Sequence, residues 1–319
     1  MKYATWLLLS LFLSACADGL SQPSSIDLES MQTPMSLYNQ ILSYRDRDFI
    51  GYRQLLKGLK EKQVIFLGEQ HDSWKTHEYQ LKILSSLFHR DKRIAIAMEM
   101  FERDVQPVLD QYTEGDLAES RFLKKSRPWP NYQSDYRPLV EFARYHKLHV
   151  IAMNTPRWIA RNVVQQGLKA IFNLSPTEKD YIAKHVDYQD SAYERYFMNA
   201  IPHSHPHMKG VKSGAYKKMM KHFTMASALK DGTMAESINL FLKDPQQTNH
   251  KILSINGRFH SDYGLAIPKR LKSRNPRVSM AIITFVPLPK GEKVKLKGYL
   301  TKPKIADFIV FTDDQKSYH

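Results

Sequence analysis

Four short apolar runs in this sequence are each followed by side chains that can act as acids, bases or ligands. The runs and the side chains after them are 64–67 with Glu69 and His71, 94–98 with Glu99, 150–153 with Arg157, and 252–255 with Arg258 and His260. In extended backbone, residues two apart project from the same face, so the Glu69 carboxylate can orient the His71 imidazole and raise its basicity. We therefore treat Glu69, His71, Glu99 and His260 as candidate catalytic residues.

The apolar runs also predict the elements that would hold these residues. They are rich in Val and Ile with little polar alternation, which is typical of strands buried on both faces of a parallel sheet, and the runs 278–286 and 306–311 share this character. Stretches with helical spacing lie between them. The predicted fold class is therefore α/β, a mostly parallel sheet flanked by helices. In such open sheets the ligand crevice lies beyond the carboxyl ends of the strands.

Local signals predict where three of the helices begin or end. Asp72 or Ser73 can cap the amino terminus of a helix that carries an apolar stripe over 80–88. Gly115 can end the helix that follows Asp104, because glycine adopts the left-handed conformation without penalty. Pro138 suits the first turn of the next helix.

Several of the candidate residues also have ordinary structural interpretations. Glu99 can cap a helix or pair with Arg103 instead of joining a shared site. The Arg157 and Arg258 guanidinium groups suit a bidentate grip on the carboxylates of a ligand, although Arg157 can equally close a salt bridge at a helix start. Asp231, which precedes Gly232, is expected to cap the helix that follows it.

Between about residues 173 and 242 the strand pattern disappears, and we expect a small helical subdomain there. Tyrosine and histidine accumulate in this segment, where an aromatic stripe is more often core than ligand site; the candidate ligands are Tyr188, Tyr193, Tyr196 and Tyr216. The alternating histidines His203, His205 and His207 stand between prolines that discourage regular structure, so we expect an extended segment. Three imidazoles on one side of it could bind a metal, while a solvated loop is the simpler interpretation.

The amino-terminal residues predict export and lipidation. Residues 1–15 have the size and polarity of a signal peptide, and Leu13-Ser14-Ala15-Cys16 resembles the lipobox of bacterial lipoproteins, in which the cysteine is diacylated through sulfur. Cys16 is the single cysteine of the chain. Residues 16–40 have the composition of a flexible tether. Residues 41–172 and 243–319 would then form the α/β domain, with 173–242 as the helical subdomain.

Composition narrows the classes of partner. The chain has 319 residues and a formal net charge of +15, which favours anionic partners such as lipid head groups or a ligand with carboxylates, or serves solubility alone. We find no run of basic residues interleaved with aromatics, and an exported protein rarely meets nucleic acid, so nucleic-acid binding is not expected. Several acyl chains on Cys16 would hold the protein on a membrane.

The ordered set of motifs resembles the ChaN family of iron-regulated bacterial lipoproteins, in the Tiki superfamily, which is also similar to erythromycin esterases. The motifs span roughly 65–311 and are Gly68-Glu69-Gln70-His71, Met98-Glu99-Met100-Phe101, Trp129 to Arg137 with Tyr136 and Arg137, Asn154-Thr155-Pro156-Arg157, Asp231 with Met234-Ala235, Asn256-Gly257-Arg258-Phe259-His260, Ile267-Pro268 and Ala306-Asp307-Phe308.

The resemblance implies haem as the cofactor, with a tyrosine as ligand to iron, arginines on the propionates and a homodimer around the haem. It also implies an α/β domain with a small helical domain. Together with Cys16 it gives the expectation of a lipid-anchored protein of haem or iron acquisition in the bacterial cell envelope, with Ala17 favouring the outer membrane, facing the periplasm.

A hydrolase is the alternative function. In that case His71 acts as general base, Glu69 and Glu99 orient it or bind a metal, and His260 is a second base or ligand on an ester or peptide substrate. A scaffold whose site has lost its activity is a third possibility.

Overall fold

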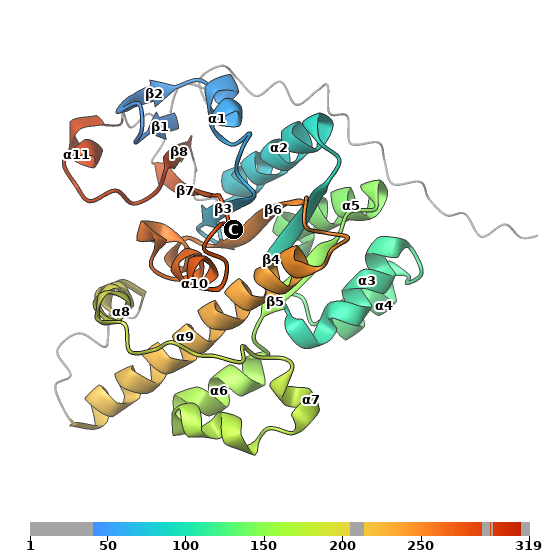
Figure 1. Cartoon of the computed structure of the whole chain (residues 1–319), viewed down its shortest axis with the longest axis vertical. Coiled ribbons are helices and arrows are strands. Elements are labelled where there is room, and N and C mark those ends of the chain that lie inside the picture. Colours follow the sequence, from blue (N-terminus) through green and yellow to red (C-terminus); the bar gives the residue numbers. More distant parts are fainter. Residues whose placement is uncertain (1–40, 205–213, 289–293, 295, 314–319) are drawn as a thin grey trace, which may run out of the picture. The chain divides into compact units, whose positions relative to one another are not determined.

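The computed structural model describes residues 41–204, 214–288, 294 and 296–313. In these residues an eight-stranded sheet has the order β2-β1-β8-β7-β3-β6-β4-β5 (Figure 1). The strands are β1 (Ile41–Ser43), β2 (Asp48–Ile50), β3 (Val64–Glu69), β4 (Ile94–Glu102), β5 (Val150–Asn154), β6 (Lys251–Gly257), β7 (Met280–Leu288) and β8 (Phe308–Asp313). Strands β3 to β8 run parallel, whereas β1 pairs antiparallel with β2 and β8. The predicted α/β class with a mostly parallel sheet is confirmed.

Helices connect the strands. They are α1 (Tyr52–Gly58), α2 (Trp74–Arg90), α3 (Gln106–Glu114), α4 (Glu119–Ser126), α5 (Arg137–His146), α6 (Arg157–Gln166), α7 (Pro176–Lys179), α8 (Ser191–Ser204), α9 (Gly214–Lys243), α10 (Ile267–Arg274) and α11 (Leu296–Leu300). Short turns of other helical types are η2 (Arg103–Val105), η3 (Tyr132–Tyr136), η4 (Leu168–Asn173), η6 (Arg258–His260) and η7 (Asp262–Gly264). No helix within these described ranges has both the length and the apolarity needed to cross a bilayer.

The predicted helix ends agree with the structure. The Ser73 hydroxyl accepts a hydrogen bond from the Thr76 backbone N–H and caps α2. Gly115 ends α3 with φ +96°, in the left-handed region that glycine adopts readily. Pro138 lies in the first turn of α5, where its missing N–H has no helical partner to lose.

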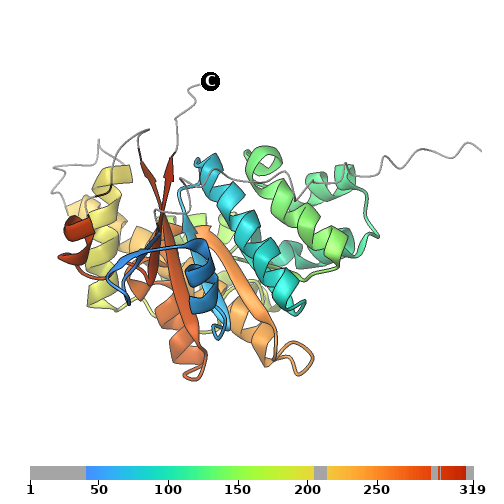
Figure 2. The ribbon, with the colours of Figure 1, turned by 90° about the horizontal axis from the view of Figure 1, so that it is seen from above.

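Helices cover both faces of the central sheet, which explains the continuous apolar runs (Figure 2). In β3, Ile65 and Leu67 pack in one core with residues of α2, α3 and α5, while Val64 and Phe66 pack in a second core with residues of α9 and α10. Because adjacent residues of a strand point to opposite faces, a strand buried on both sides has no polar alternation.

Helix α9 contributes to two separate cores. Its carboxyl-terminal half packs on the sheet through Met234 and Ile238. Its amino-terminal half, with Met225 and Leu229, packs against α6 and η4 in a smaller helical core that includes Val163. The predicted boundaries at 173 and 242 stay a prediction, and α9 is the element that connects the smaller core to the sheet.

Helix α8 corrects one expectation for the histidine segment. It runs to Ser204 through Pro202, so the backbone at His203 is helical and not extended. A proline near the end of a helix removes only one backbone hydrogen bond, which the helix tolerates. His205 and His207 lie outside the described residues, as do Cys16, the signal peptide and the tether.

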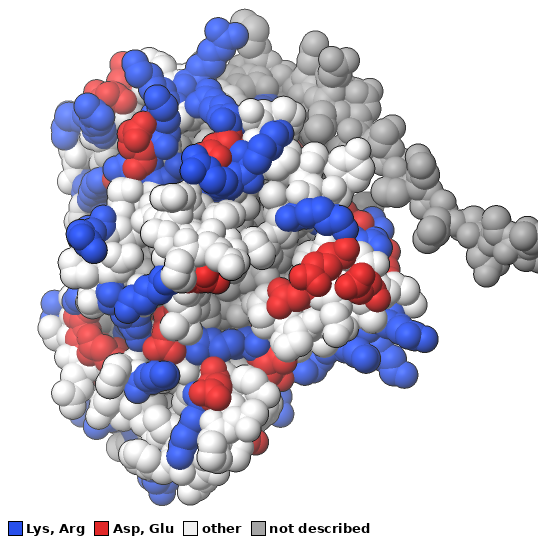
Figure 3. Space-filling view, turned by 45° about the vertical axis from the view of Figure 1, so that its right-hand side comes forward, with Lys and Arg blue, Asp and Glu red and all other residues white. Residues whose placement is uncertain are grey.

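On one face of the molecule the basic residues are spread out and not gathered in one place (Figure 3). On the face in Figure 3, Lys and Arg side chains surround uncharged areas, with Asp and Glu side chains between them. On this face, such a distribution serves solubility and general attraction of anions.

Candidate functional site

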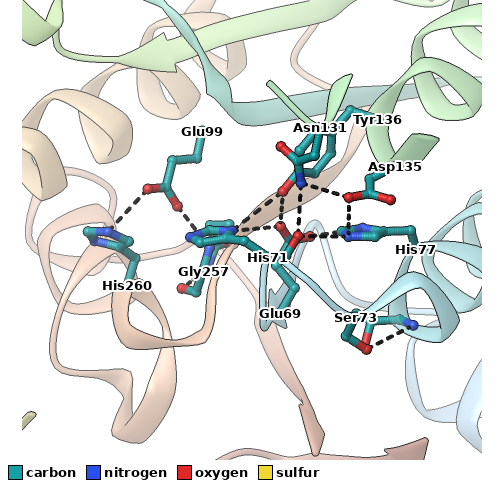
Figure 4. A network of polar contacts seen from close by, with 12 residues as sticks. Glu69, His71, Ser73, His77, Glu99, Asn131, Asp135, Tyr136, Gly257 and His260 are labelled. Atoms are coloured by element: carbon teal, nitrogen blue, oxygen red, sulfur yellow. Dashed lines mark hydrogen bonds and ion pairs between the residues drawn. The ribbon is translucent and has the colours of Figure 1, made fainter. Parts of the chain in front are cut away.

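The strand order places the candidate residues at one edge of the sheet. β6 lies between β3 and β4, with Gly257 of β6 paired to Glu69 of β3. Glu99 therefore does not stand on a strand next to Glu69, although the two strands follow each other in the sequence. Glu99 and His71 approach each other over Gly257, because glycine has no side chain in the way (Figure 4).

The close approach at Gly257 is tight. A Cβ added there would lie 2.9 Å from Cε1 and Nε2 of His71 and 3.6 Å from Oε2 of Glu99. The backbone N–H of Gly257 donates a hydrogen bond of 2.8 Å to that same Glu99 oxygen. Only glycine at position 257 leaves room for the His71 and Glu99 side chains in these positions. Gly257 therefore has a positioning role.

Glu69 is a buried carboxylate that holds one nitrogen of His71. It accepts hydrogen bonds from Nδ1 of His71 at 2.9 Å, the Tyr136 hydroxyl at 2.7 Å and Nε2 of Gln80 at 2.6 Å. Because the carboxylate accepts, the proton of a neutral His71 is assigned to Nδ1, which leaves Nε2 with a free lone pair.

The electrostatic surroundings make His71 a stronger base. Burial lowers its pKa, but the hydrogen bond to Glu69 and the charge of Glu99 outweigh that effect, so the pKa of His71 is raised above its ordinary value. Its side chain keeps 42% of its surface exposed. An exposed imidazole with an oriented ring and a free nitrogen can take a proton from water or a ligand.

A segment from Trp129 to Tyr136 packs against His71 and fixes its position. The Trp129 ring meets the His71 ring edge-on, with centroids 4.8 Å apart. The Asn131 side chain donates to the His71 backbone oxygen at 2.9 Å and to Asp135 at 2.7 Å. The turn η3 in this segment is π-helical, a rare conformation that is frequent at functional sites.

His260 lies on the other side of Glu99 and is held by two carboxylates. Its Nδ1 is 2.5 Å from Oδ1 of Asp231, and its Nε2 is 3.3 Å from Oε1 of Glu99. Burial lowers the pKa of His260, but the two carboxylates outweigh it and raise this pKa from 6.5 to about 9. Burial acts to raise the pKa of Glu99, yet the charge of His260 reverses the effect and lowers it. His260 is therefore an imidazolium at neutral pH with no nitrogen left for a ligand.

Asp231 was expected to cap a helix, and this expectation is wrong. The residue lies in the interior of α9, where apolar residues on both sides of it pack in the cores described above, so the helix continues through Asp231 and Gly232. Its second oxygen accepts a hydrogen bond of 2.5 Å from the Tyr193 hydroxyl. Asp231 thus joins the helical region to the sheet edge through His260.

Both predicted arginines lie at the sheet edge but are engaged by carboxylates of the chain. Nε of Arg157 is 2.5 Å from Glu102, which is the salt-bridge alternative considered above. Nε of Arg258 is 2.9 Å from Asp262. Arg103 pairs with Glu236 and not with Glu99.

The four predicted tyrosines lie in different surroundings. Tyr193 is fully buried and its hydroxyl is taken by Asp231 and Ser227. The Tyr196 ring stacks on Phe259 with centroids 4.9 Å apart, and burial raises its pKa. Tyr188 is half-buried in the loop before α8, where no hydrogen bond engages its hydroxyl within the described residues. Tyr216 is half-buried near the start of α9.

A metal site does not emerge from the described part of the chain. There, no group of three or more His, Cys, Asp or Glu side chains is arranged to hold an ion. The histidine segment that suggested one is described only as far as the backbone of His203.

Three further side chains contact the site, although the sequence analysis assigned none of them a role: Tyr136, Gln80 and Trp129. Gln80 stood within an apolar helical stripe, and its burial next to Glu69 follows from that stripe. Tyr136 stood in a quoted motif, but no local pattern indicates that its hydroxyl reaches a residue 67 positions earlier.

Comparison with known proteins places these features in a family. Residues 55–271 match the family model described as haem-binding uptake, Tiki superfamily, ChaN. The structure of ChaN of Campylobacter jejuni with cofacial haem is similar with a TM-score of 0.64 and 18% identity, over 85% of this chain and 95% of that one. That likeness shows a shared fold.

The chain is also similar to two other proteins. An erythromycin esterase, EreC, in its open conformation has a TM-score of 0.43 and 13% identity over 75% of this chain and 73% of that one. The chloroplastic protein RETICULATA-RELATED 5 of Arabidopsis thaliana is 22% identical over 82% of this chain. The chain spans about a third of the length of that curated relative, 35%.

Proposed function

The chain belongs to the haem-binding uptake family of the Tiki superfamily, the ChaN family, and on this premise we propose that it binds haem and acts in haem or iron acquisition. The family match over residues 55–271 is the observation that carries the proposal. Haem supplies a flat apolar ring, a ferric ion that accepts oxygen ligands, and two carboxylates.

The residues of the helical region fit such a ligand. Ferric iron accepts a phenolate, and Tyr188 has a hydroxyl that no described residue engages. Tyr193 does not fit, because Asp231 holds its hydroxyl. Trp158 and Phe172, with 40% and 76% of their surfaces exposed, offer aromatic surface on α6 and η4. We propose Tyr188 or Tyr216 as the ligand to iron.

Cofacial haem in the Campylobacter jejuni protein supports a homodimer that encloses haem between two copies of this chain. Lipidation of Cys16 would place the protein on a bacterial membrane, and we propose the outer membrane, facing the periplasm. Replacement of Cys16 by Ser should release the protein from the membrane fraction and abolish labelling by fatty acid. Continued labelling of that variant would rule out Cys16 as the anchor.

Hemin titration followed by absorption spectroscopy tests the haem proposal. The purified protein should bind hemin and show a tyrosinate band, which Tyr188→Phe or Tyr216→Phe removes. Tyr145→Phe is the matched control, because Tyr145 is 76% exposed on α5, outside the helical region. A protein that stays colourless with excess hemin contradicts the proposal.

Hydrolysis is a second candidate function, favoured by the free Nε2 of the oriented His71. In the reaction, Nε2 takes a proton from water while the water oxygen forms a bond to an ester carbonyl carbon. The resulting imidazolium then returns the proton to the alkoxide as the carbon–oxygen bond of the ester breaks. Glu69 holds the ring throughout.

An ester panel tests this second function. Activity should rise with pH as His71 loses its proton, with a midpoint above the ordinary histidine value because the pKa of His71 is raised. His71→Ala should abolish it, and His89→Ala on the exposed face of α2 should not. Equal rates in His71→Ala and the native protein exclude His71 as the base.

A further inference from the structure

A cleft lies beside helix α10, away from the site around His71. It has a volume of about 500 Å³, which is within the usual range of roughly 300–1,000 Å³ for small-molecule sites. Its residues come from α10, from the first half of β7 and from two flanking segments. Met280 of β7 pairs with Val64 at the start of β3, whereas Glu69 ends that strand. The cleft therefore lies toward the other end of the strands and shares no residue with the site described above.

The floor of the cleft is apolar. Met280 and Ile282 are two residues apart in β7, so their side chains project from the same face of the sheet. Both side chains pack against the core that α9 and α10 form with the sheet, and both are half-buried, so part of each still faces the cleft. Pro268, in the first turn of α10, adds further apolar surface. An apolar chain of a ligand can therefore displace water from this floor.

Two lysines of α10 also line the cleft. Lys269 and Lys272 are three residues apart, which places them on the same side of the helix. The Lys269 ammonium group pairs with Asp190, while that of Lys272 donates to the Val278 backbone oxygen at 3.0 Å. Lys272 thus has no counter-ion among the described residues. Because an ammonium group has three N–H donors, Lys272 keeps donors for an anion in the cleft.

Asp307, which lines the cleft as well, does not oppose such an anion. Its Oδ2 accepts a hydrogen bond of 2.8 Å from the Ile282 backbone N–H, and its Oδ1 accepts one of 2.5 Å from Lys304. The charge of Asp307 is therefore balanced by Lys304, as that of Lys269 is balanced by Asp190. The charge left over in the lining is the positive charge of Lys272.

We propose that the cleft binds an amphiphilic carboxylate of the fatty-acid class, with its apolar chain on Met280 and Ile282 and its carboxylate on Lys272. An apolar chain alone would gain burial but no ion pair, and a small carboxylate alone would gain only an exposed ion pair, which is weak. The cleft offers no tyrosine or histidine to iron, so this inference is independent of the haem proposal.

Nuclear magnetic resonance of the Met280 methyl group tests the inference. The full chain is labelled with ¹³C at the methionine methyl groups and titrated with octanoate at constant ionic strength. Met280→Leu identifies the Met280 signal by its loss. We expect a saturable shift of this signal, and none for Met98, which packs in the core on the other face of the sheet. Octanol, which lacks the charge, and acetate, which lacks the chain, should each bind at least about tenfold more weakly.

Further variants separate the role of Lys272 from general electrostatics. Lys272→Met should weaken octanoate binding about tenfold or more, whereas Lys272→Arg keeps the charge and should stay within about threefold of the native protein. Ser273→Phe, at an exposed position in the lining, should fill the cleft and abolish the titration. Lys124→Met is the matched control, because Lys124 is exposed on α4, which packs in the core on the other face of the sheet.

Native-like octanoate binding in Lys272→Met overturns the inference, and so does octanol binding as tight as that of octanoate. A native protein whose Met280 signal does not shift with octanoate overturns it as well. Hemin titration of Ser273→Phe separates the inference from the haem proposal, since hemin binding should be unchanged there. Loss of hemin binding in that variant would make the cleft part of the haem site and overturn a separate one.

Discussion

Two histidines flank Glu99, and their surroundings differ. His71 has one carboxylate partner and a side chain that is 42% exposed, whereas His260 has two carboxylate partners and a side chain that is 10% exposed. They follow neighbouring strands, β3 and β6. A histidine at the sheet edge is therefore not reactive by its type and position alone. The number of its hydrogen-bond partners determines whether its imidazole has a nitrogen free to react.

The largest expected effect separates the two histidines by stability. Asp231→Asn removes one charge from the buried group around His260, and we expect the free energy of unfolding to fall by about 3–5 kcal/mol. His71→Ala should lower the free energy of unfolding by less, because a half-exposed imidazole contributes little to stability. Urea denaturation measures both. Asp116→Asn, at an exposed position, is the control. Similar losses at Asp231 and His71 would remove the distinction.

The pH dependence of stability sharpens the same comparison. The pKa of His260 rises from 6.5 to about 9 on folding. Its contribution to the free energy of unfolding is therefore complete below pH 6.5 and is lost as the pH rises through 9. The free energy of unfolding should fall by about 3 kcal/mol over this range. His260→Gln should flatten the stability profile between these values, whereas an unchanged profile would show that another group titrates.

Gly257→Ala tests the close approach of His71 and Glu99 over Gly257. The new methyl group would collide with the His71 ring, so we expect a loss of about 1–3 kcal/mol and a changed His71 resonance. Gly214→Ala is the matched control, because nothing lies within 4 Å of a Cβ placed there. If the His71 resonance stays the same in Gly257→Ala, the tight approach is absent.

The smallest expected effect concerns Tyr136. Tyr136→Phe removes one hydrogen bond to Glu69 and should cost about 1 kcal/mol in unfolding free energy. It should also raise the pKa of His71 further, since Glu69 then interacts more strongly with the imidazole. Titration of the His71 resonance measures this change, and a lowered pKa would contradict the arrangement.

The fold was predictable from the sequence where burial leaves a strong pattern. The runs at 64–67 and 252–255 coincide with β3 and β6, because strands buried on both faces are mostly apolar and show no polar alternation. The short strands β1 and β2 of three residues each carry too little pattern to be recognised. Strand order was also out of reach, since the insertion of β6 between β3 and β4 depends on contacts far apart in the chain.

The sequence predicts which residues at the strand ends belong to the site. It does not predict the hydrogen-bond partners that lie far from them in the chain. Glu69 and His71 are two residues apart, so their contact follows from local geometry. The contact of Asp231 with His260 joins residues 29 positions apart, and Asp231-Gly232 has the local appearance of a helix start. Only the continuous packing of α9 reveals that the helix passes through that point.

Helix α9 spans about 45 Å at 1.5 Å per residue, with Asp231 just past its midpoint. One end of the helix packs among the small helices and the other on the sheet. A ligand that displaced α9 at the small helices would change the separation of Asp231 and His260. Binding of that ligand and protonation of His260 would then be thermodynamically linked, each altering the affinity of the other by the same factor.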